Sequence, residues 1–166
     1  MLKAEMTSKM IEFYGGAVND VTHFLKVHSY ARTIAVLEKV DAKTLDIIEL
    51  SAIVHDIACP LCRQKYGNAA GHLQELESPA LLASFLGEFD LEKEVSDRII
   101  WLVSHHHTTD KVDGIDHRIL LEADFLVNAE KLSANRSSIE EFRRKVFRTE
   151  NGCRLLDMIH LGNKTE

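Results

Sequence analysis

Residues 44–60 read TLDIIELSAIVHDIACP, and this segment decides the fold that the sequence predicts. Its apolar residues recur at intervals of three and four, the period of one helix face, at Leu45, Ile48 and Ala52. His55 continues this stripe, with Asp56 beside it. A helix that starts after Asp41 must end before Pro60, because proline lacks a backbone N–H and its ring collides with the preceding turn. We therefore predict a helix whose last turns present a histidine and an aspartate.

Helical periodicity continues on both sides of this segment. An earlier helix carries His28 on its apolar face. Later in the chain, an apolar stripe leads to His105 and His106 at a helix end, and a further helix carries Asp124 at the border of its apolar face. No stretch shows the alternation of a strand, and no repeat or linker interrupts the sequence. We therefore predict an all-α fold, a single-domain helical bundle over residues 1–166.

The composition limits both the class and the partners of the chain. With 45% hydrophobic and 28% charged residues, two prolines and eight glycines, the 166 residues are typical of one globular, helix-rich domain. Three cysteines, an odd number, indicate no disulfide framework. A net charge of −6 argues against binding to a nucleic-acid polymer. Because no apolar run resembles a signal peptide or a membrane span, we expect a cytoplasmic protein with no membrane partner; the sequence leaves open whether it forms a homo-oligomer.

The predicted interior holds several ionisable groups. Four helices turn imidazole or carboxylate groups toward aliphatic surroundings: His28, His55 with Asp56, His105 or His106, and Asp124. Taken singly, each has an ordinary explanation, such as a hydrogen-bonded core histidine or an ion pair of Asp124 with Arg32 or Arg118. Taken together, they would place unpaired carboxylates in the core, at a cost that a divalent cation removes by coordinating them. The pattern therefore predicts a metal site.

The order of these residues resembles the signature of the HD-domain metal-dependent phosphohydrolases: a histidine, then the pair HD, then an aspartate, on separate helices. The matching pieces are VHSYART at 27–33, AIVHDIA at 52–58 and LEADFLVN at 121–128. The resemblance covers about residues 20–135 and implies a helical bundle of the HD type. It also implies that the first metal is held by His28, His55, Asp56 and Asp124.

Binuclear members of this family carry further histidines between the HD pair and the last aspartate. This chain has His72, His105 and His106 in that interval, and the resemblance implies that Asp56 bridges two ions. Both His105 and His106 remain candidates, since they lie side by side at the end of one apolar stripe. A mixed set of histidines and carboxylates suits Mn, Fe, Co, Ni or Zn better than calcium, which prefers oxygen ligands alone. We therefore expect one or two divalent transition-metal ions.

The resemblance implies a hydrolase of small phosphorylated compounds, with nucleotides the first candidates, that works as a phosphomonoesterase or a phosphodiesterase. Metal-bound hydroxide would attack phosphorus, and Asp56 would hold the metal that generates it. Arg32, one helical turn after His28, is the first candidate for a cation that binds the phosphoryl oxygens, and Lys111 is the second.

Other functions fit the same predicted ligands. The segment after the histidines reads TTDKVDG at 108–114 and lacks the glycine, tyrosine and proline motif of the cyclic-di-nucleotide phosphodiesterases, so the sequence favours the small stand-alone members of the family. The first alternative is a di-iron oxygenase, since inositol oxygenase resembles the same helical ligand set. The second is a non-catalytic module that binds a metal or a nucleotide. Oxygen-dependent turnover with iron would indicate the oxygenase, and tight nucleotide binding without turnover would indicate the module.

Overall fold

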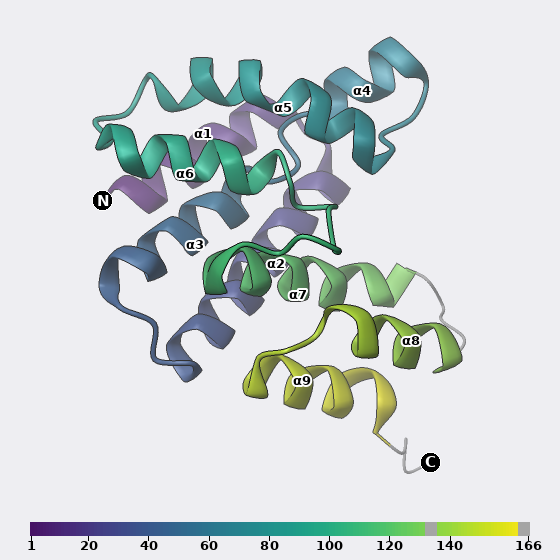
Figure 1. The fold of residues 1–166 in the computed structure, drawn as a ribbon. Helices are drawn as coiled ribbons and strands as arrows, with labels where there is room; N and C mark the ends of the chain where they lie inside the picture. The colour runs from purple at the N-terminus through teal and green to yellow at the C-terminus, as the bar shows by residue number, and fades with distance from the viewer. Residues whose placement is uncertain (132–135, 163–166) are drawn as a thin grey trace.

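The protein is built from helices and their connections in the part that the structure, a computed structural model, describes: residues 1–131 and 136–162. Within those ranges there is no β-strand, which confirms the predicted all-α fold. The helices in chain order, drawn in Figure 1, are α1 (Leu2–Tyr14), α2 (Val18–Leu37), α3 (Ala42–Val54), α4 (Cys59–Tyr66), α5 (Gly71–Leu86), α6 (Lys93–Val103), α7 (Gly114–Lys131), α8 (Arg136–Val146) and α9 (Glu150–Leu156). A π-helical turn, Asp157–Leu161, follows α9.

Helix α2 is the centre of the bundle. It packs along α3 and along α7, and these are the most extensive contacts between helices in the described ranges. Its buried apolar residues follow helical spacing: Phe24, Val27, Ala31 and Ile34. Helices α5 and α6 pack on each other, while α8 and α9 contact α7 on the far side of the molecule (Figure 1). Among the described residues, none of the helices combines the length and the apolar character that crossing a membrane would require.

The segment that decides the fold forms α3 and the turn after it. The Asp41 carboxylate accepts a hydrogen bond from the Thr44 N–H at 3.0 Å, which caps the start of the helix. The helix ends one residue before His55, so His55 and Asp56 lie in a tight turn between two helices. Pro60 belongs to the first turn of α4, where the missing N–H has no helical partner to lose. The HD pair is thus fixed from both sides by helix.

A buried carboxylate attaches the C-terminal helices to α7. Glu122 accepts hydrogen bonds from the backbone N–H of Arg148 at 2.6 Å and of Thr149 at 3.0 Å, and from the Thr149 hydroxyl. Burial raises the pKa of Glu122, although these hydrogen bonds act in the opposite direction. Gly152 packs against the same carboxylate so closely that a Cβ would lie 2.0 Å from its Oε2. The start of α9 is therefore held at a fixed position on α7.

Candidate metal centre

Four ionisable side chains converge at the C-terminal end of α3. His23 belongs to α2, His55 and Asp56 to the turn after α3, and Asp124 to α7. His23 Nε2 lies 3.1 Å from Asp124 Oδ1 and 3.2 Å from Asp56 Oδ2. It is also 3.2 Å from His55 Nε2, which in turn lies 3.5 Å and 3.7 Å from the same two carboxylate oxygens. These four residues form the central cluster.

Backbone carbonyls determine which ring nitrogen faces the carboxylates. The Nδ1 of His55 lies 2.8 Å from the Ala52 carbonyl oxygen, and the Nδ1 of His106 lies 2.7 Å from the Val103 carbonyl oxygen. A carbonyl oxygen only accepts, so Nδ1 carries the hydrogen in both rings and Nε2 is a bare lone pair when the ring is neutral. The Nε2 of His106 is buried without a hydrogen-bond partner among the described residues, 3.6 Å from Asp56 Oδ1. Metal-binding histidines adopt this same arrangement.

The charges within the central cluster depend on one another. Burial alone would lower the pKa of His23, but its hydrogen bonds to Asp124 and Asp56 outweigh this effect and raise the pKa to about 9. Burial alone would raise the pKa of each aspartate, and the neighbouring histidines instead hold both values below the ordinary range. Two ionised carboxylates so close together thus require a cation between them, either the protonated imidazolium of His23 or a metal ion.

A second group of possible ligand atoms adjoins the first. One ligand atom each of Asp56, His106 and His107 lies within 4.8 Å of the others. The His107 Nε2 is buried and has no hydrogen-bond partner within residues 1–131 and 136–162. Burial, with the nearby His106 as a smaller contribution, lowers the pKa of His107 to about 4. His107 is therefore neutral at pH 7, the form in which an imidazole binds a metal.

Side chains around these two groups fix their orientation. Asn128 Nδ2 donates to both carboxylate oxygens of Asp124, at 2.9 Å each. Glu75 on α5 accepts a hydrogen bond from the backbone N–H of His107 at 3.0 Å. Gly71, at the start of α5, lies against the His107 ring, and a Cβ at that position would be 2.6 Å from the ring Cγ. Helix α5 therefore positions the turn that carries His106 and His107.

The structure does not bring His28, which the sequence predicted as a metal ligand, into the central cluster, and His23 lies there instead. His28 Nε2 lies 3.2 Å from Glu49 Oε1. Five residues along a helix correspond to a rotation of about 140°, so the two histidines of α2 cannot face the same neighbour. Arg32 is also directed away from the central cluster: its guanidinium donates to Glu49 at 2.9 Å and its side chain is 53% exposed. The buried Glu49 also pairs with Lys3 and so joins α1, α2 and α3.

The remaining predicted residues lie outside both groups of ligand atoms. His105 Nδ1 bonds the Trp101 carbonyl oxygen at 2.7 Å, and the two rings stack with centroids 4.3 Å apart. Of these two candidates, His106 belongs to a group of possible ligand atoms and His105 does not. His72 is exposed in the first turn of α5, and Lys111 is exposed in the connection between α6 and α7. His55, Asp56, His106 and Asp124 are the predicted residues that the structure brings together.

A sequence signal for His23 was present. Val27, Ala31 and Ile34 form the buried stripe of α2, and four residues before Val27 the same stripe reaches His23. The prediction of His28 follows if Leu25, three residues before it, is counted as a core residue. In the structure Leu25 is 40% exposed, so the buried face of α2 contains His23 and not His28. No comparable signal marks His107, because its burial depends on the approach of α5.

Two cavities flank the central cluster. One has a volume of about 490 Å³ and is lined by His23 together with residues of α2, α4 and α7. The other, of about 150 Å³, is lined by His106, His107 and Asp124, with the stacked rings of Phe125 and Phe142 beside them. Each cavity is therefore lined by one residue of the central cluster, His23 in the first and Asp124 in the second.

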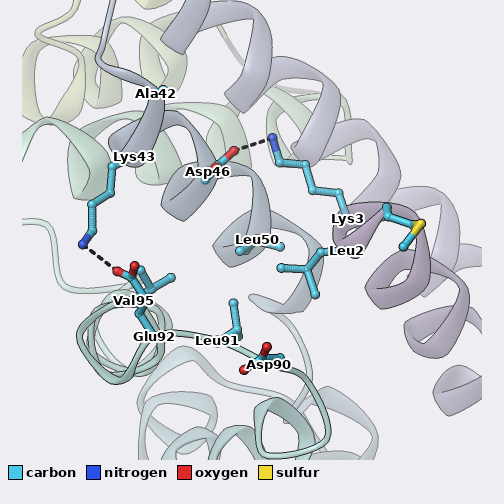
Figure 2. A pocket seen from close by; sticks show the side chains of 11 residues that line it. Leu2, Lys3, Ala42, Lys43, Asp46, Leu50, Asp90, Leu91, Glu92 and Val95 are labelled. Atoms are coloured by element: carbon cyan, nitrogen blue, oxygen red, sulfur yellow. Dashed lines mark hydrogen bonds and ion pairs between the residues drawn. The ribbon is translucent and has the colours of Figure 1, made fainter.

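A larger cavity, of about 680 Å³, lies elsewhere, between α1, α3 and the start of α6 (Figure 2). Two ion pairs are at its wall, between Lys3 and Asp46 at 2.8 Å and between Lys43 and Glu92 at 3.0 Å. No residue of the central cluster lines it. Its volume alone therefore does not make it a candidate reaction site.

Comparison of the chain with models of protein families, with curated proteins and with solved structures found no match. A function therefore has to be inferred from the residues of the site itself.

Proposed function

We propose that this chain is a metal-dependent phosphohydrolase of the HD-domain type, which acts on a small phosphorylated compound, with nucleotides the first candidates. The central cluster is the observation that supports this proposal most directly. It gathers the buried carboxylate of Asp124, the carboxylate of Asp56, which is 17% exposed, and two imidazoles within hydrogen-bond distance or little more. This donor set suits Mn, Fe, Co, Ni or Zn, as one ion or two.

Each side chain has a place in the proposed site. The first ion would be held by His23, His55, Asp56 and Asp124, and the second by Asp56, His106 and His107. The two oxygens of Asp56 support this division, since Oδ2 is the one 3.2 Å from His23 Nε2 and Oδ1 is the one 3.6 Å from His106 Nε2. Asp56 would therefore bridge the two ions.

The bound metal would act as a Lewis acid. It would lower the pKa of a bound water from ~15.7 toward ~7 and offset the negative charge of phosphoryl oxygens. The protein's own residues would fix the geometry. The Nδ1–H bonds of His55 and His106 keep each Nε2 directed at Asp56, and Asn128 orients both oxygens of Asp124. Burial of His55, His106 and Asp124 excludes bulk water from them and strengthens the electrostatic interactions in which they take part.

The surroundings of the central cluster favour a small substrate. The adjoining cavity of about 490 Å³ is within the size range of pockets that hold nucleotide-sized molecules. The net charge of −6 supports the same choice, because a nucleic-acid polymer would need a basic surface.

The test is phosphate release from mononucleotides, dinucleoside polyphosphates and p-nitrophenyl phosphate, with Mn, Co, Ni, Fe or Zn added in turn. The wild-type chain is compared with Asp56→Ala and with Asp46→Ala, an exposed aspartate on α3 that serves as the matched control. We expect turnover that depends on the metal, is retained in Asp46→Ala and is lost in Asp56→Ala.

Other outcomes would exclude the hydrolase. Bound metal without phosphate release from any compound contradicts the proposal. Oxygen consumption with bound iron would then indicate the oxygenase, and tight nucleotide binding without turnover would indicate the binding module.

A further inference from the structure

The cavity on the His23 side of the central cluster has a polar, charged wall built from three helices. Helix α2 contributes its first two turns, α4 contributes Arg63, and α7 contributes Val127 and Glu130. Lys26 is one helical turn after His23, a rise of about 4.5 Å along α2, and lines the same cavity. The wall thus runs from the central cluster outward to two cationic side chains.

His23 connects this cavity to the proposed metal site. It lines the cavity although only 6% of its surface is exposed. Its Nε2 faces the two aspartates, and its Nδ1 has no hydrogen-bond partner among the described residues. A ligand bound in this cavity would therefore lie against a buried residue of the central cluster.

Arg63 and Lys26 each form an exposed ion pair that an anionic ligand can break. Arg63 donates to both carboxylate oxygens of Asp20, one of them at 3.2 Å, which links α4 to α2. Lys26 lies 2.7 Å from Glu130, which links α2 to α7. Both cationic side chains are 46% exposed, and exposed pairs of this kind contribute little to stability. An anionic group of a ligand can take the place of either carboxylate, and arginine suits a phosphate or carboxylate especially well because it binds through two parallel hydrogen bonds.

We propose that this cavity is a substrate subsite in which Arg63 and Lys26 bind a second anionic group, while the scissile phosphate lies at the central cluster. The substrate class is a small organic phosphate that carries another phosphate or a carboxylate. This inference rests on the proposed function for the position of the scissile group. Asp20 and Glu130 set the selectivity, because an uncharged substituent gains nothing by displacing them.

The cavity of Figure 2 provides the contrast. It also contains two lysines paired with acids, but no residue of the central cluster lines it. A ligand there would have no proposed metal site beside it. Lys43→Gln is therefore a matched control, which removes an exposed, paired cation from a cavity without the central cluster.

The test uses non-hydrolysable phosphonates and the full chain loaded with Mn²⁺. A short series of ω-carboxyalkylphosphonates is compared with alkylphosphonates of the same length by isothermal titration calorimetry. We expect at least one carboxylate to bind about tenfold more tightly than its uncharged counterpart, the effect of one charge-assisted hydrogen bond. Arg63→Gln should remove this advantage, Lys26→Gln should reduce it, and Lys43→Gln should leave it unchanged. Asp20→Asn should increase it, because Arg63 is then free.

Hydrolysis of p-nitrophenyl phosphate, which has no second anionic group, is measured on the same samples and tests the proposed function separately. Metal-dependent hydrolysis without any carboxylate advantage would overturn the subsite and leave the hydrolase in place. A carboxylate advantage that survives in Arg63→Gln also overturns the subsite. If neither p-nitrophenyl phosphate nor any other compound of the phosphate-release panel is hydrolysed, but the advantage is present and is lost in Arg63→Gln, the anion subsite holds and the hydrolase fails.

Discussion

The two histidines of α2 provide the most specific test of the proposed metal centre. His23 and His28 are five residues apart on one helix, and each is close to carboxylate oxygens. We predict that His23→Ala abolishes tight metal binding and that His28→Ala does not. The two substitutions remove the same chemical group from the same helix, so each is the control for the other.

The magnitude follows from the contacts. His23 Nε2 lies within 3.2 Å of both Asp56 and Asp124, so its loss removes one of four proposed ligands. Loss of a group that only orients a ligand costs about 10–100-fold in metal affinity, and loss of a direct ligand should cost at least about 100-fold, or about 2.8 kcal/mol. His28→Ala removes only one of the partners of Glu49, so we expect metal affinity within about twofold of wild type and a free energy of unfolding lower by about 1 kcal/mol.

The assay is equilibrium dialysis against Mn²⁺ or Co²⁺, with the bound metal measured by mass spectrometry. Far-UV circular dichroism and urea denaturation establish that both variants are folded. Phosphate release from the best substrate of the panel then reports on activity. Retained metal in folded His23→Ala, together with lost metal in His28→Ala, would refute the proposed ligand set and restore the assignment made from the sequence.

Three further predictions concern the groups that support the site and the fold. Burial alone would raise the pKa of Glu49, but its cationic partners lower the pKa below the ordinary value of 4.5. The ionised carboxylate therefore stabilises the fold at neutral pH, and this contribution is lost as the pH falls through the lowered pKa. Glu49→Gln should flatten the acid side of a plot of urea midpoint against pH. Gly71→Ala places a methyl group 2.6 Å from the His107 ring and should weaken binding of a second metal ion at least about tenfold, measured as metal stoichiometry. Glu122→Ala leaves the backbone N–H groups of Arg148 and Thr149 without their hydrogen-bond acceptor. It should lower the free energy of unfolding, measured by urea denaturation, by about 3 kcal/mol.

Each of these three has an outcome that contradicts it. An acid limb as steep in Glu49→Gln as in the wild type would remove Glu49 from the account of acid stability. Unchanged metal stoichiometry in Gly71→Ala would mean that His107 is no ligand, because alanine is otherwise favoured over glycine in a helix by about 1 kcal/mol and the fold should tolerate it. An unchanged free energy of unfolding in Glu122→Ala would mean that this carboxylate does not hold the start of α9 on α7.

The sequence was sufficient for the fold class and for part of the site. The period of three to four residues in 44–60 gives a helix that starts after Asp41, as in the structure, although this helix ends at Val54 and His55 and Asp56 lie in the turn after it. His55, Asp56 and Asp124 follow from the same pattern, because each adjoins or lies on a helix whose apolar face is unambiguous. Local periodicity is enough where a single stripe is buried.

Only the tertiary structure decided the rest. Helix α2 is packed between α3 and α7, and its exact rotation between them, which the sequence does not specify, determines that His23 rather than His28 meets the aspartates. His107 becomes a possible ligand only because Gly71 and Glu75 of α5 close over it, a contact between segments more than thirty residues apart. Periodicity determines which residues share a helix face, whereas the packing of neighbouring helices determines what that face touches.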